Sequence, residues 1–166
     1  MLLLKLLPLL LRLLKLEQFR CRALTPGEIA LCQRVFGQLI DYSRVSIMNH
    51  PYLPWQPAHI LMAPQGYIHV RDPLYREDYS QAPLALQAVL IHEMTHIYQH
   101  QQQINVLLKG ALLQTAFYLS AGRYNPYRYQ LIPGKPFFAY NIEQQGDIAR
   151  DIFLNKIDNI ILHPPV

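Results

Sequence analysis

The chain has few cysteines and little charge. Of its 166 residues, only two are cysteine and 16% are charged, whereas 51% are hydrophobic, so a disordered chain is excluded. Cys21 and Cys32 lie eleven residues apart, a spacing that does not fit a zinc ribbon. The sequence leaves open whether the two thiols pair or remain buried and reduced. No Asn-x-Ser/Thr acceptor site for N-glycosylation is present.

The chain also lacks an uninterrupted apolar run at its leucine-rich start, although a transmembrane helix needs about 20 apolar residues. The first 16 residues are interrupted by Lys5, Pro8, Arg12 and Lys15. These interruptions exclude a membrane span, and the missing small-residue cleavage site argues against a signal peptide. We predict that residues 1–20 form a cationic amphipathic leader. Residues 1–16 would either contact a membrane surface or carrier protein, or dock on the domain or a second copy.

Acidic residues are too few to neutralise the chain. Fifteen Lys and Arg stand against eleven Asp and Glu, giving a net charge of +4. The first twenty residues hold four basic residues and one acidic residue, which is +3, so the remainder carries only +1. This near-neutral remainder predicts a single domain over residues 21–166 with no nucleic-acid footprint. We interpret the tyrosine-rich basic run 123–129 as a loop near an active site.

The segment 89–99 contains the pattern His-Glu-x-x-His. On a helix, positions i and i+4 share a face, so His92 and His96 can bind one metal ion together. Glu93 lies about 100° around the same helix. Two imidazoles beside a carboxylate that deprotonates water are what a zinc peptidase needs. The sequence therefore predicts one Zn²⁺ ion, with Glu93 as the general base.

The surroundings of this pattern are apolar. We predict one helix over residues 82–103, with Ser80 as its N-cap and Pro83 in its first turn. The alternative is an amphipathic helix that exposes both histidines, but buried His and Glu would be costly without partners. His100 continues the i+4 series, yet it lies about 12 Å along the axis from His92, too far to share a metal ion.

A second helix is predicted to follow Asn141, a typical N-cap residue, and to run to about residue 159. It offers Glu143 as the third metal ligand. Asp147 shares that face and would accept the free ring N–H of a metal-binding histidine. Gly146 costs helix stability but allows a second helix to approach closely. The alternative is an ordinary amphipathic helix with exposed acidic residues.

These two motifs together resemble the gluzincin pattern, in which His-Glu-x-x-His is completed by a later Glu-x-x-x-Asp. Segments 24–30, 36–45, 91–96 and 133–146 are similar to the zinc metallopeptidase domains at the C-termini of Vgr-type spike proteins of type VI secretion, and to their stand-alone relatives. The resemblance extends in order over about residues 24–155. It assigns the metal to His92, His96 and Glu143, and the general base to Glu93.

The resemblance implies a mainly helical α+β, zincin-like fold with a small sheet or hairpin beside the His-Glu-x-x-His helix. It implies a zinc endopeptidase that acts on a protein or peptide. The same family would make the protein an antibacterial effector toxin, cytoplasmic in its producer and active in the periplasm of a target cell. A secretion carrier and an immunity protein would then be its partners.

Two other functions fit the same residues. One is a non-enzymatic module that zinc stabilises and that attaches to a membrane or a delivery machine. The other is a housekeeping maturation peptidase with the same site. Peptide hydrolysis would also need a donor to the oxyanion besides zinc. We name Tyr127, Tyr129 and Tyr140 as candidates without ranking them.

Further patterns predict the scaffold. Thr25 to Glu28 reads as a capping box that starts a helix to about residue 40. Residues 45–48 predict a strand, and residues 59–62 and 67–70 predict a hairpin. Trp55 is expected to anchor the core. Residues 104–121 are apolar almost all round, which predicts a buried helix rather than a membrane span.

Overall fold

The computed structural model describes residues 18–164. The predictions for the leader therefore concern residues that lie almost wholly outside this range. Within the described range, no helix combines the length and the apolarity that a bilayer span requires.

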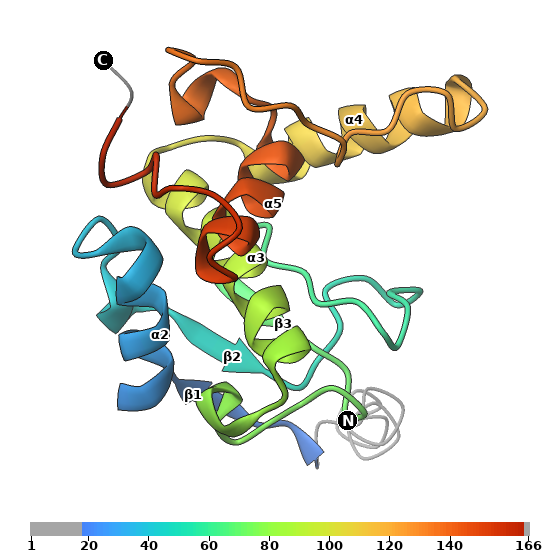
Figure 1. The fold of residues 1–166 in the computed structure, drawn as a ribbon. Coiled ribbons are helices and arrows are strands. Elements are labelled where there is room, and N and C mark those ends of the chain that lie inside the picture. The colour runs from blue at the N-terminus through green and yellow to red at the C-terminus, as the bar shows by residue number, and fades with distance from the viewer. Residues whose placement is uncertain (1–17, 165–166) are drawn as a thin grey trace.

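The fold is α+β and mainly helical, as predicted. Four α-helices accompany a three-stranded sheet in the described part of the chain, and α3 lies at the centre with α5 and the sheet beside it (Figure 1). The helices are α2 (Pro26–Phe36), α3 (Leu84–Gln101), α4 (Val106–Leu119) and α5 (Ile142–Phe153). The strands are β1 (Cys21–Ala23), β2 (Ser46–Met48) and β3 (Tyr67–His69), in the order β1-β2-β3.

The capping box of α2 is confirmed. The Thr25 side chain accepts from the Glu28 N–H, and the Glu28 carboxylate accepts from the Thr25 N–H. The helix ends at Phe36, four residues before the predicted end, because Gly37 adopts a left-handed φ of 53°.

The start of α3 corrects the sequence prediction. Pro83 occupies the N-cap position without a side-chain hydrogen bond, and Ser80 belongs to a short 3-10 helix, Tyr79–Gln81. Ser80 does not cap α3 because the helix begins only at Leu84, and Ser80 lies three residues before the N-cap position in a turn that Asp78 caps. The helix itself spans the predicted His-Glu-x-x-His segment.

The core lies where α2, the sheet and α5 surround α3. Its centre is formed by side chains with no exposed surface, namely Val35, Phe36, Ile47, Ile68, Leu90, Ile91, Met94, Ile97 and Ile148. Cys32 is buried in this core, whereas Cys21 on β1 is exposed, and both thiols are free. The sequence had left this question open.

The predicted hairpin is only partly formed. Strand β3 pairs in parallel with β2, while β1 and β2 are antiparallel. Residues 59–62 form no strand and meet β3 through a single antiparallel bridge between Met62 and His69. The non-local pairing with β2 replaces most of the local pairing that the hairpin pattern indicated.

Two burial predictions were wrong. Trp55 is 74% exposed and anchors no core. Helix α4 projects from the body of the molecule (Figure 1), and Val106 is its one buried residue. The apolar sequence of α4 is therefore not explained by packing within the described chain.

Candidate metal centre

The three predicted ligands converge where α3 and α5 pack together. His92 and His96 come from α3 and Glu143 from α5, and one donor atom of each lies within 4.8 Å of the others. The Nε2 atoms of His92 and His96 lie 3.4 Å and 3.7 Å from Oε2 of Glu143. Two imidazole nitrogens and one carboxylate oxygen form the donor set that is typical of catalytic zinc.

The start of α5 is shaped to present Glu143. Asn141 caps the helix, and its side chain accepts from the N–H groups of Glu143 and Gln144. This confirms the predicted N-cap. The helix ends at Phe153, earlier than predicted, and Asn155 follows with a left-handed φ of 55°. The metal-facing turn is thus fixed by local capping at its beginning.

Each histidine is oriented through its Nδ1 atom. Nδ1 of His92 lies 3.0 Å from Oδ1 of Asp147, and Arg150 forms a 2.8 Å ion pair with the same oxygen. The predicted orienting residue is therefore in place, and it acts on His92. With Nδ1 protonated and bonded in this way, Nε2 is left to bind a metal.

Gln99 plays the corresponding part for His96. Its Oε1 lies 2.9 Å from Nδ1 of His96, and its Nε2 donates to the Ile142 carbonyl and to Oε1 of Gln145. Gln145 in turn donates to the Tyr140 carbonyl. Gln99 and Gln145 are buried, so this amide network ties His96 to the first turn of α5. This network was not predicted from the sequence, although the i+3 spacing of Gln99 from His96 indicates that the two side chains share a helix face.

Glu93 lies beside the triad with one oxygen unsatisfied. The residue is only 7% exposed, and its Oε2 has no hydrogen-bond partner among the described residues. Burial raises the pKa of Glu93, while His96 and His92 oppose that shift. An orphaned, buried carboxylate is costly to maintain and is found chiefly where a ligand or a reaction uses it.

Comparisons with known proteins show which family the chain belongs to. No family model matches the chain. The type VI secretion system spike protein VgrG2b of Pseudomonas aeruginosa is 48% identical over 136 residues, which cover 81% of this chain and 13% of that protein. The solved effector domain of Pseudomonas aeruginosa VgrG2b matches with a TM-score of 0.74 and 48% identity, covering 80% of this chain and 73% of that one. This chain belongs to the VgrG2b effector-domain family.

The electrostatics of this VgrG2b-type domain suit a cation. Burial lowers the pKa of His92, but hydrogen bonds to Asp147 and Glu143 outweigh it and raise that pKa to about 10. Burial raises the pKa of Glu143, but a hydrogen bond to His92 and the charge of His96 lower it overall. Negative charge therefore accumulates around two imidazole nitrogens, and a divalent cation is well matched to it.

The three candidate tyrosines are placed differently in this VgrG2b-type domain. The hydroxyl of Tyr129 donates to Asp151 over 2.6 Å, and the hydroxyl of Tyr140 accepts from the Ile132 N–H. The ring of Tyr127 lies 6.3 Å from that of His92. Burial and the charge of Glu143 raise the pKa of Tyr127, which keeps its hydroxyl protonated. Tyr127 is thus the candidate that the structure brings to the metal centre.

Proposed function

We propose that this VgrG2b-type domain is a zinc-dependent endopeptidase. His92, His96 and Glu143 would hold the ion, since their free donor atoms face one another and both Nδ1 atoms are already engaged. When bound, zinc supplies Lewis-acid activation of water and of the peptide carbonyl. The observation that carries the proposal is the buried, unpartnered Oε2 of Glu93 beside this triad.

Glu93 would accept a proton from the attacking water and pass it to the leaving amine. A carboxylate with a raised pKa is suited to both halves of that transfer, because it binds the proton more tightly than an exposed glutamate does. Tyr127 would donate a hydrogen bond to the oxygen that becomes negative during attack, since its hydroxyl stays protonated near Glu143.

We further propose that the protein acts as an antibacterial effector delivered by type VI secretion into the periplasm of a target cell. Family membership with the effector domain of a spike protein supports this role. A peptide or protein would be the substrate, and an immunity protein would guard the producer.

The test of hydrolysis uses the full chain loaded with zinc and a mixture of unfolded proteins as substrate, with new N-termini identified by mass spectrometry. Glu93→Gln should retain one zinc per chain by elemental analysis and lose activity by about a hundredfold or more. Full activity of Glu93→Gln would remove the proposed base. If the unmodified chain and Glu93→Gln both retain zinc and neither cleaves the substrates, the metal would instead have a structural role.

The test of the compartment compares expression in the cytoplasm of a Gram-negative host with expression behind an export signal. We expect growth arrest only after export, and no arrest with exported Glu93→Gln. Equal growth with and without export would favour a maturation peptidase over an effector toxin.

A further inference from the structure

The outward face of α4 is apolar along its whole length. At 100° per residue, seven exposed positions of this helix fall within an arc of about 140°. Leu112, Tyr118 and Leu119 are 61%, 71% and 84% exposed. The only polar member, Thr115, donates its hydroxyl to the Ala111 carbonyl and offers solvent little. The seven residues, here called the α4 face, are Leu107, Leu108, Ala111, Leu112, Thr115, Tyr118 and Leu119.

Nothing in the described chain covers the α4 face. The opposite side of the helix meets α5, where Gly110 faces the side chains of Ile142 and Glu143. Beyond this contact the helix extends away from the body of the molecule (Figure 1). A helix that is apolar all round is normally buried. A continuous exposed apolar surface of this kind marks an interaction site.

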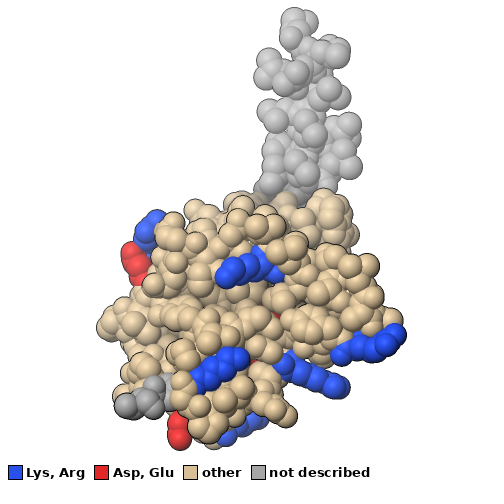
Figure 2. All heavy atoms as spheres, turned by 90° about the horizontal axis from the view of Figure 1, so that it is seen from above, with Lys and Arg blue, Asp and Glu red and all other residues tan. Residues whose placement is uncertain are grey.

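The surroundings of the α4 face are basic. Lys109 lies on α4 and Arg123 follows the C-terminal end of this helix, and residues 94–142 contain no Asp or Glu. Neither of these two cations forms an ion pair within residues 18–164. Figure 2 shows basic residues scattered over an otherwise neutral face, with acidic residues near its edge.

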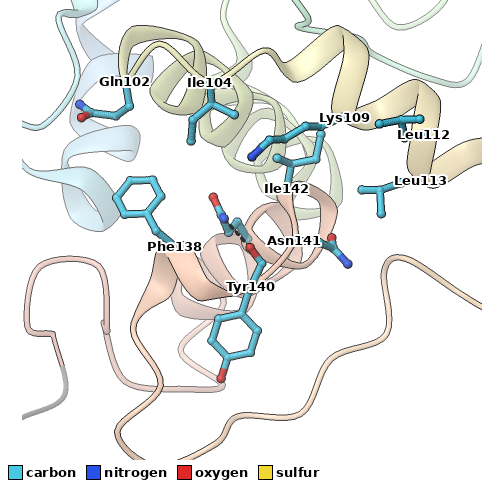
Figure 3. A pocket seen from close by; sticks show the side chains of 10 residues that line it. Gln102, Ile104, Lys109, Leu112, Leu113, Phe138, Tyr140, Asn141 and Ile142 are labelled. Carbon is cyan, nitrogen blue, oxygen red and sulfur yellow. Dashed lines mark hydrogen bonds between the residues drawn. The ribbon is translucent and has the colours of Figure 1, made fainter.

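A groove along the inner edge of α4 combines apolar and amide side chains with one cation. It has a volume of about 510 Å³ and lies between α4, the turn at Phe138 and the first turn of α5. Figure 3 shows Lys109 in this groove beside Leu112 and Ile142. Lys109 is the one charged side chain of this lining, so the groove adds a positive charge beside the α4 face.

Charge decides among the possible occupants of the α4 face. A second copy would bring the same two cations against this surface, and the basic residues of segment 1–16 would be repelled in the same way. An anionic phospholipid surface attracts the cations and accepts the leucines. Tyr118 and Tyr124, both exposed, suit the boundary between headgroups and acyl chains.

We propose that the α4 face docks on an anionic phospholipid bilayer, with α4 lying in the plane of the interface. The helix does not span the membrane, and docking needs neither the metal nor hydrolysis. The proposal therefore stands or falls separately from the proposed peptidase activity.

The experiment measures sedimentation of the full chain with vesicles. We expect binding to vesicles of phosphatidylcholine with phosphatidylglycerol, weaker binding to phosphatidylcholine alone, and loss of binding at high salt. The variant Leu112→Ser with Leu119→Ser should bind about tenfold more weakly or worse. Circular dichroism establishes that both proteins are folded.

A matched control changes exposed leucines outside the α4 face. Leu84 on α3 is 60% exposed and Leu39 after α2 is 41% exposed, so Leu84→Ser with Leu39→Ser removes two exposed leucines from elsewhere on the surface. This control should bind vesicles as the parent chain does. Equal binding by the α4 variant would place the contact elsewhere, in the leader above all, and would overturn the proposal. A different result would favour a second copy as the occupant. If the parent chain is a dimer by light scattering and does not bind vesicles, and the α4 variant is a monomer, the membrane proposal is overturned.

Discussion

Gly146 on α5 lies directly against the imidazole of His92 on α3. A Cβ atom at position 146 would lie 2.5 Å from Cε1 and 2.7 Å from Nδ1 of that ring. Real Cβ contacts are not this short, so any larger residue would push the ring or the helix away. The sequence prediction that Gly146 permits a close helix approach is confirmed, and the contact is made at the ring of a proposed metal ligand.

We therefore expect Gly146→Ala to weaken zinc binding by about a hundredfold, because it displaces His92 from Glu143. Zinc affinity measured by competition with a chromogenic chelator tests this directly. Gly110→Ala is the matched control, since its added Cβ would lie 3.8 Å from Ile142 and 4.0 Å from Oε1 of Glu143, both ordinary contacts. This control should keep zinc affinity and gain up to about 1 kcal/mol in helix stability. Equal zinc affinity in both variants would contradict the steric argument.

Gln99→Leu removes the hydrogen-bond partner of Nδ1 of His96 without touching a metal ligand. We expect zinc affinity to fall by about 10- to 100-fold, as is usual when a group that orients a ligand is lost. The visible spectrum of the Co²⁺-substituted protein should change as His96 turns. The variant should also lose about 1–3 kcal/mol of stability, because buried partners of the amide are left unpaired.

Gln101→Leu provides the control on the same helix. Gln101 also makes two hydrogen bonds through its amide, but to the exposed backbone of Asp41. The zinc affinity and Co²⁺ spectrum of the Gln101→Leu variant should match those of the unmodified chain. An unchanged Co²⁺ spectrum in Gln99→Leu would show that His96 is held by other means.

The sequence predicts most of the metal site because most of its geometry is local. The spacing of His92 and His96 places them on one helical face, and Asn141 begins the helix that carries Glu143 and Asp147. The interaction of Gln99 with α5 escapes prediction, since it depends on how two helices separated by 40 residues pack together. The same holds for the choice among the tyrosines, whose positions are set by a loop.

Helix α4 shows a second limit of prediction from sequence, which concerns burial. Its apolar residues predict a helix correctly, but they also predict burial, which is wrong. Composition shows that a side chain is apolar, but it does not show whether another part of the chain packs against it. The predicted hairpin is incomplete for a related reason. Local alternation at residues 59–62 competes with the non-local pairing of β3 with β2, which the sequence pattern does not contain.

The two thiols should differ sharply in reactivity. Cys21 is exposed, whereas Cys32 is fully buried, and burial together with the charge of Glu28 raises the pKa of its thiol. We expect one fast-reacting thiol per native chain with an aromatic disulfide reagent, and two after unfolding in denaturant. Cys21→Ser should abolish the fast phase. An intact mass two hydrogens lower under non-reducing conditions would instead indicate a disulfide.

Glu28 should be the charged residue on which stability outside the metal site depends most. It has no exposed surface, and its two oxygens accept from both terminal nitrogens of Arg22 and from the N–H groups of Thr25 and Tyr79, each over 2.8 Å. Glu28→Gln leaves the guanidinium of Arg22 buried without its counter-charge. Urea unfolding should show a loss of about 3 kcal/mol or more.

The exposed pair of Arg20 and Glu77 is the control for this stability prediction. It is as short, at 2.7 Å, but its side chains are 58% and 71% exposed. Solvent screening should limit the cost of Glu77→Gln to less than about 1 kcal/mol. Equal costs for the two substitutions would show that burial does not strengthen the contact of Glu28 with Arg22.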